Sequence, residues 1–170
     1  SGFARNSTGL TGRVGTTLDF NRTLVGQIAG GYTGRRYEDP RLAELRGAVG
    51  DVSLIWSATP LTTIGLRAQT SVDESTTPGV SGVLAHKGTV EIAHAFLRNL
   101  TLTGAGSFQR ADYKGIPLVE DTITGTVRLD YKLSRTVVVH ASYAHDRFKS
   151  TNPAADYTAN MFMVGLRLQR

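Results

Sequence analysis

Residues 121–146 alternate in side-chain polarity along two arms, which are joined by a tight connection at residues 132–135. Every second residue of the first arm is apolar or glycine, namely Ile123, Gly125, Val127, Leu129 and Tyr131. The residues between them are threonine, arginine and aspartate, and the second arm alternates in the same way. A period of two predicts a β-strand with two chemically different faces. Each arm runs for about ten residues, the length that a tilted strand needs to cross a bilayer. The stretch therefore predicts a transmembrane β-hairpin.

The same alternation recurs along the chain. We expect strands at about residues 10–18, 23–37, 47–57, 61–73, 82–96, 100–113 and 157–168, in addition to the two arms of the hairpin. Tight turns centre near residues 21, 59, 98 and 134, and polar loops centre near residues 42, 78, 117 and 153. A repeat of roughly 38 residues fits one membrane-crossing hairpin with its turn and loop. Short turns that alternate with longer loops are typical of the periplasmic and extracellular ends of an outer-membrane barrel.

The fold class expected from this pattern is all-β, an antiparallel up-and-down transmembrane β-barrel. About nine strands are counted, whereas bacterial single-chain barrels have an even number with both termini in the periplasm. We therefore expect the chain to be the C-terminal part of a larger barrel. Residues 1–9 are expected to form a flexible N-terminal segment, and residues 10–170 are expected to form the barrel domain.

Composition excludes several other classes of protein. No apolar run approaches the roughly 18 residues of a membrane helix. The mean hydropathy of −0.14 does not argue against a barrel, because lipid-facing and lumen-facing residues cancel in the average. The chain has no cysteine, and no His/Asp/Glu cluster has metal-ligand spacing, so we expect no metal site and no cofactor. The net charge of +5 is spread along the chain without a Lys/Arg run, which argues against a nucleic-acid partner.

The polar side of the alternation carries the candidate functional residues. If the apolar side meets lipid, the charged residues of the other side line the lumen, namely Arg13, Arg35, Asp51, Arg67, Lys87, Glu91, Arg128, Asp130, His140 and Arg167. One interpretation is a water-filled passage whose charges tune the permeation of polar solutes. The other is a plugged interior, in which the charges pair with one another across strands.

Aromatic residues cluster at both ends of the expected strands. Phe20, Trp56, Phe96 and Tyr131 lie next to tight turns, and the set nearer the polar loops is Tyr32, Tyr113, Tyr143 and Tyr157. Two such groups are expected as girdles where amphipathic rings meet lipid headgroups. The alternative is a soluble antiparallel barrel that holds a small ligand, but its strands would usually be shorter, near five or six residues.

One pattern resembles an enzyme site. His140 and Ser142 are two residues apart on one strand, so both side chains share a face, as in outer-membrane lipid hydrolases. Asp146 lies an even number of residues from both, so it has the same parity, meaning that its side chain is on the same face of the strand. However, the pair falls on the polar side, whereas a lipid-cleaving site should face the bilayer. We therefore expect no enzyme, and the hydrolase is retained as an alternative function.

Three segments carry a family resemblance: PLTTIGLRAQTSVDESTTPG (60–79), AFLRNLTLTGAGSFQRADYKG (95–115) and ADYTANMFMVGLRLQR (155–170). They resemble the "putative β-barrel porin 2" family of Gram-negative, chiefly alphaproteobacterial, outer membranes. The resemblance implies a protein of the bacterial outer membrane, of a kind often found near exopolysaccharide production and export, and it carries over no catalytic residue. The expected function is passage of polar solutes or exopolysaccharide, or a structural role in the envelope. The expected partners are outer-membrane lipid and lipopolysaccharide, together with such a solute or exopolysaccharide.

Overall fold

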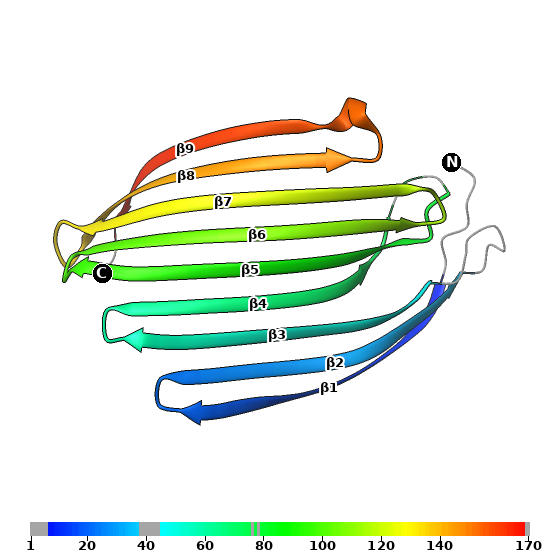
Figure 1. Ribbon diagram of the computed structural model, residues 1–170, viewed down its shortest axis with the longest axis horizontal. Helices are drawn as coiled ribbons and strands as arrows, with labels where there is room; N and C mark the ends of the chain where they lie inside the picture. Colours follow the sequence, from blue (N-terminus) through cyan, green and yellow to red (C-terminus); the bar gives the residue numbers. More distant parts are fainter. Residues whose placement is uncertain (1–6, 38–44, 76, 78, 169–170) are drawn as a thin grey trace.

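The structure, a computed structural model, describes residues 7–37, 45–75, 77 and 79–168 of the 170-residue chain. Its strands are β1 (Ser7–Asn21), β2 (Leu24–Tyr37), β3 (Leu45–Thr59), β4 (Thr62–Asp73), β5 (Gly82–Leu97), β6 (Leu100–Lys114), β7 (Leu118–Lys132), β8 (Val137–Ser150) and β9 (Tyr157–Leu168). They form one nine-stranded sheet in the order β1 to β9, and every neighbouring pair is antiparallel (Figure 1). This confirms the predicted antiparallel up-and-down arrangement.

Two kinds of connection define the two ends of the sheet. The turn end carries residues 22–23, 60–61, 98–99 and 133–136, and the loop end carries residues 74–81, 115–117 and 151–156. A short 3-10 helix, η1 (Pro153–Ala155), lies in the last of these. No helix among the described residues is long and apolar enough to cross a membrane.

Most strands are longer than the side-chain alternation predicted. β7 begins at Leu118 and reduces the expected 114–120 loop to residues 115–117, where Gly115 has a φ of 111°. β1 begins at Ser7, so the expectation of a flexible segment is wrong for residues 7–9, and residues 1–6 lie outside the described part. Thr8 and Gly9 pair with Arg36 and Arg35 of β2. Backbone pairing needs no apolar side chain, so the ladder continues into the polar strand ends.

The register separates two faces across the whole sheet. One row of paired residues is almost entirely apolar: Leu24, Trp56, Ile64, Ile92, Gly104, Val127, Tyr143 and Phe162. A row on the opposite face is polar: Thr17, Gln27, Ser53, Arg67, Thr89, Ser107, Thr124 and Asp146. The period of two therefore sorts the side chains by polarity, as the sequence predicted.

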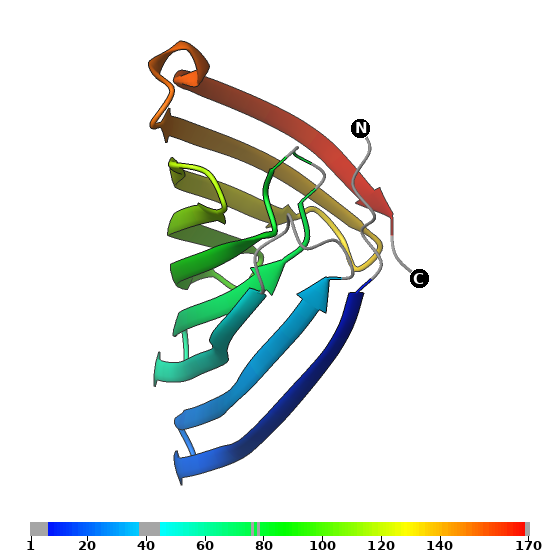
Figure 2. The ribbon, with the colours of Figure 1, turned by 90° about the vertical axis from the view of Figure 1, so that its right-hand side faces the viewer.

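The sheet is strongly curved, with its two edge strands swept to the same side (Figure 2). Its glycines show which face is concave, because bending crowds side chains on the inside and spreads them on the outside. On the polar face, a Cβ added at Gly15 would lie 2.8 Å from the Cβ of Ala29, and one at Gly165 would lie 2.5 Å from Nε2 of His140. On the apolar face, a Cβ added at Gly12 or Gly30 would meet nothing within 4 Å. The polar face is the concave one, and the apolar face is convex.

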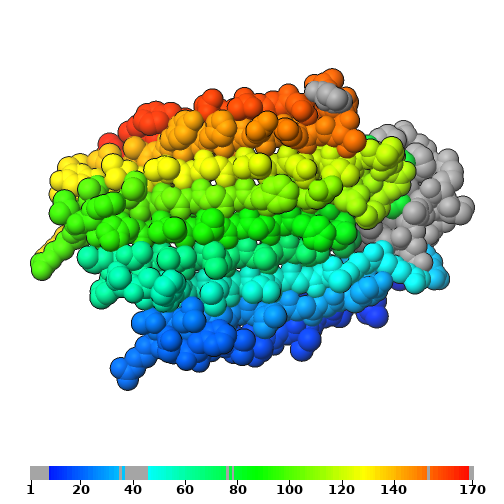
Figure 3. Space-filling model, viewed as in Figure 1, coloured from blue at the N-terminus to red at the C-terminus, as the bar shows by residue number. Residues whose placement is uncertain are grey.

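Most large apolar side chains are therefore on the outside. Leu10, Phe162 and Leu168, all on the convex face, are 83%, 71% and 79% exposed. Among the described residues only Val80, Ala111 and Val138 are buried hydrophobics. The strands themselves pack edge to edge into one continuous surface (Figure 3). A soluble barrel would enclose its apolar face, so this curvature fits contact with lipid.

The aromatic residues divide between the two faces. Phe20, Trp56, Phe96 and Tyr131 lie on the convex face at the turn end, and Tyr32 lies on that face towards the loop end. Tyr143 is also convex, but it lies in the middle of β8, opposite Val127, and not near the loops.

The expectation of a lipid-facing girdle is wrong for Tyr113 and Tyr157, which both lie on the concave face. Tyr113 has the opposite parity to Phe108 on β6, and its hydroxyl donates a 2.7 Å hydrogen bond to Glu120. Tyr157 stacks on Phe148 of β8 at a centroid distance of 5.0 Å. Proximity to a loop had suggested a girdle, but strand parity decides which face a ring occupies.

Candidate functional site

The charged residues that the sequence singled out share the concave face. The described side chains in this set are Arg13, Asp51, Arg67, Lys87, Glu91, Arg128, Asp130, His140 and Arg167, and each has the parity of the polar face. Arg35 lies in β2, and its side chain is outside the described part of the structure.

Two ion pairs neutralise part of this charge. Arg13 on β1 pairs through Nη2 with Oδ1 of Asp51 on β3. The intervening strand β2 presents Ala29 and Gly31 at the facing positions, and these small residues leave room for the arginine to cross it. On β7, Nε of Arg128 lies 2.7 Å from Oδ2 of Asp130. The role of Ala29 and Gly31 could not be predicted from the sequence, because it depends on the register of three strands.

Arg67 and Lys87 are not neutralised in this way. With Glu91 they line a depression of about 410 Å³ on β3, β4 and β5, together with Ser53 and Thr89. No ion pair within the described residues engages these three charges. Two cations and one carboxylate leave the depression with a net positive charge.

The depression continues towards the loop end. A second hollow of about 270 Å³ shares Gln69 and Lys87 with the first and adds Ser71, Asp73 and Gln109. The two hollows together make a polar track along the strand direction, lined by amide, hydroxyl and charged groups. Such groups replace the hydrogen bonds of a hydrated solute, and they offer weak binding along a path.

The residues of the hydrolase alternative do not form a catalytic group. His140, Ser142 and Asp146 share the concave face of β8, away from the side that meets lipid. The His140 ring covers Gly165 of β9, and its Nδ1 is buried without a hydrogen-bond partner. Asp146 is six residues further along an extended strand, roughly 20 Å away. No hydrogen bond joins His140 to Ser142 in the described part of the chain, so a base-activated nucleophile is not assembled there.

The positions of the described side chains do not indicate a metal site. No group of three or more His, Asp or Glu residues gathers within ligand distance among the residues that the structure describes. The described part of the concave face is thus a charged and polar surface.

A curved up-and-down sheet with an apolar convex face and a charged concave face defines the class of outer-membrane β-barrel proteins. The whole chain, residues 1–170, matches the family described as "Putative beta-barrel porin 2", and the chain belongs to that family. It is a porin-like protein of the bacterial outer membrane.

Solved structures show the same fold. OmpT of Vibrio cholerae expressed in the outer membrane is 13% identical with a TM-score of 0.61, over 94% of this chain and 56% of that one. In-vitro folded OmpT of Vibrio cholerae is 14% identical with a TM-score of 0.60, over 94% and 55%. The chain thus spans about half the length of these OmpT chains. The NanC porin is 11% identical with a TM-score of 0.54, over 96% of this chain and 98% of that one. A comparison with curated proteins gives no match.

Proposed function

We propose that the concave face lines a passage for polar solutes through the outer membrane and that anionic solutes are favoured. The observation that carries this proposal is the pair Arg67 and Lys87, which are unpaired cations in a 410 Å³ depression beside a single carboxylate. Unpaired charges on a water-facing wall raise the local concentration of counter-ions. The ion pairs Arg13–Asp51 and Arg128–Asp130 contribute no comparable net charge.

The passage is proposed without an enzymatic step. The hydroxyl, amide and charged groups of the polar row suit hydrated solutes, including the hydroxyl-rich chain of an exopolysaccharide. The NanC structure is named a porin, and its likeness to this chain supports the same kind of role.

Reversing both cations with Arg67→Glu and Lys87→Glu is expected to change ion selectivity from anions to cations. The measurement is the reversal potential and single-channel conductance of the protein, purified from outer membranes and inserted into planar bilayers under a salt gradient. The permeability ratio should change by at least about tenfold, because four elementary charges change and each acts on an ion about 8 Å away with about 0.5 kcal/mol in water, part of which salt screens.

The matched control is Lys149→Glu, a charge reversal on the convex face, which should leave selectivity unchanged. Steady conductance with unaltered selectivity in the double variant would mean that the depression lies outside the path. A silent bilayer containing folded, heat-modifiable protein would overturn the passage and indicate a structural role in the envelope.

A further inference from the structure

Charged side chains on the apolar convex face gather at one end of it. Within the described residues, those on this face are Arg36, Arg46, Arg110, Asp112, Lys114, Asp121, Arg147 and Lys149, and all lie towards the loop end of their strands. Six are cations and two are carboxylates. The remaining convex surface, down to the turn end, carries no charged side chain in the described strands. A charge that faces hydrocarbon is costly in the middle of a bilayer and nearly free at its surface, so this end reaches the headgroup level.

Arg110, Arg147 and Lys149 form the centre of this basic zone. Arg110 on β6 pairs in register with Asp121 on β7, which pairs with Lys149 on β8, and Arg147 lies two residues from Lys149 on the same face. Nε of Arg110 is 3.9 Å from Oδ1 of Asp121, too far for a hydrogen bond, and that oxygen is buried without a hydrogen-bond partner. Arg147 and Lys149 make no ion pair with any described residue. Three cations and one carboxylate leave a net charge of about +2 at pH 7.

The nearby acid and histidines do not cancel this charge. Asp112 is already paired with Lys114. His86, which faces Arg110, is hydrogen-bonded to Thr70 at 2.9 Å, and His145 is hydrogen-bonded to Asn160 at 2.8 Å. The cluster thus holds more cations than its one internal carboxylate, Asp121, can neutralise.

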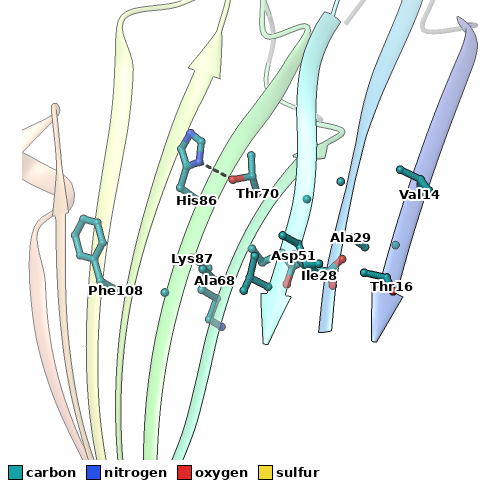
Figure 4. Close-up of a pocket in the computed structure, with 16 residues that line it drawn as sticks. Val14, Thr16, Ile28, Ala29, Asp51, Ala68, Thr70, His86, Lys87 and Phe108 are labelled. Atoms are coloured by element: carbon teal, nitrogen blue, oxygen red, sulfur yellow. Dashed lines mark hydrogen bonds between the residues drawn. The ribbon is translucent and has the colours of Figure 1, made fainter. Parts of the chain in front are cut away.

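Apolar hollows lie directly beside the cations. One of about 160 Å³ is lined by Phe108 and Ile123 together with Asp121, Arg147 and Lys149. On the other side of Phe108 lies a hollow of about 780 Å³, whose convex-face lining includes the small residues Gly30, Gly50, Ala68 and Gly88. Figure 4 shows this larger hollow extending from Phe108 across the strands to Val14. The surface therefore combines an excess of positive charge with apolar hollows beside it.

We propose that Arg110, Arg147 and Lys149 bind a phosphate group of lipopolysaccharide, with its acyl chains along Phe108, Ile123 and the small-residue hollow. The positive charge of the cluster favours a phosphate group as the ligand, because guanidinium groups bind phosphate through paired hydrogen bonds and an ammonium group adds a point charge. Position selects the leaflet, because the longer connections of an outer-membrane barrel face the exterior, where lipopolysaccharide is the phosphate-bearing lipid. The site is independent of the passage on the concave face.

The test compares two triple variants. The convex variant loses three cations of the convex face through Arg110→Gln, Arg147→Gln and Lys149→Gln. The concave variant loses three cations of the concave face through Arg67→Gln, Lys87→Gln and Arg167→Gln. Each protein is purified from outer membranes in mild detergent, checked for heat-modifiable folding, stripped of lipid and titrated with purified lipid A by native mass spectrometry. The wild type and the concave variant should bind lipid A equally, and the convex variant should bind it about tenfold or more weakly, since charged hydrogen bonds are lost.

Two further ligands distinguish the source of the phosphate. Dephosphorylated lipid A should bind the wild type as weakly as intact lipid A binds the convex variant. Inorganic phosphate alone, at the same concentration, should not displace lipid A, because it lacks the acyl chains. Equal lipid A binding by all three proteins would overturn the proposal, as would equal binding of the phosphorylated and dephosphorylated forms. If phosphatidylglycerol bound as tightly as lipid A, the proposed specificity for lipopolysaccharide would be wrong.

Discussion

Replacing Val127 with arginine is expected to destabilise the folded protein by about 2–4 kcal/mol, the cost of a cation near the middle of a bilayer. Val127 is 49% exposed on the convex face, in the row that also contains Ile92, Tyr143 and Phe162. No acidic side chain of this row could pair with the new charge. The measurement is the free energy of unfolding in urea, with the protein folded into liposomes and monitored by tryptophan fluorescence and by heat-modifiable migration.

The matched control is the preceding residue. Thr126→Arg adds the same side chain to the same strand, but on the concave face opposite Ala105 and Ala144. It should change stability by no more than about 0.5 kcal/mol, since the guanidinium stays in water. The reverse order, with Thr126→Arg more harmful than Val127→Arg, would mean that the apolar face is enclosed and that the protein is not a membrane barrel.

Replacing Gly31 with valine is expected to cost about 3 kcal/mol or more, because it forces side-chain atoms into the neighbouring strand. A Cβ at this position would collide with the carbonyl oxygen of Gly12 and would lie 3.0 Å from Cα and 2.7 Å from Cγ of Arg13. The backbone oxygen belongs to the ladder between β1 and β2 and cannot rotate away. The change would also push Arg13 from its contact with Asp51. Unfolding in urea and the fraction of heat-modifiable protein are the measurements.

Gly30→Ala tests whether crowding, and not the loss of a glycine, is responsible. Gly30 is the adjacent residue on the convex face, where a Cβ meets nothing within 4 Å. Alanine should stabilise the strand by about 0.5–1 kcal/mol by restricting the unfolded chain. Equal losses for both variants would contradict the assignment of the concave face.

The presence of each strand and the face on which each of its side chains lies were predictable, because both follow from the period of two. Residues 157–168 were predicted as a strand and form β9 with the same bounds. The adjacent residues Thr126 and Val127 were assigned to opposite faces, and the register agrees. Several other strand ends were not predictable, since pairing at Leu118 or Ser7 depends on backbone hydrogen bonds that leave no trace in side-chain alternation.

Which charged residues form ion pairs could not be predicted from the sequence. Arg13 and Asp51 are 38 residues apart, and their contact requires the register of β1, β2 and β3 together with small residues on β2. One residue of the convex basic cluster did have a signal. Arg110 lies within the predicted strand 100–113 and on the same side of it as Phe108, so the alternation indicated the apolar face for this residue, whereas Arg147 and Lys149 lie beyond the predicted arm, which ended at residue 146.

The strictly sequential strand order also bears on how such sheets diversify. Within the described residues each strand pairs only with the strands before and after it, so duplicating or deleting one complete hairpin keeps the direction and the face of every other strand. Adding a single strand would instead send the rest of the chain to the opposite side of the membrane. The circumference of barrels built in this way can therefore change by duplication or deletion within the gene, in units of two strands. Each retained hairpin keeps the same side chains on the same faces.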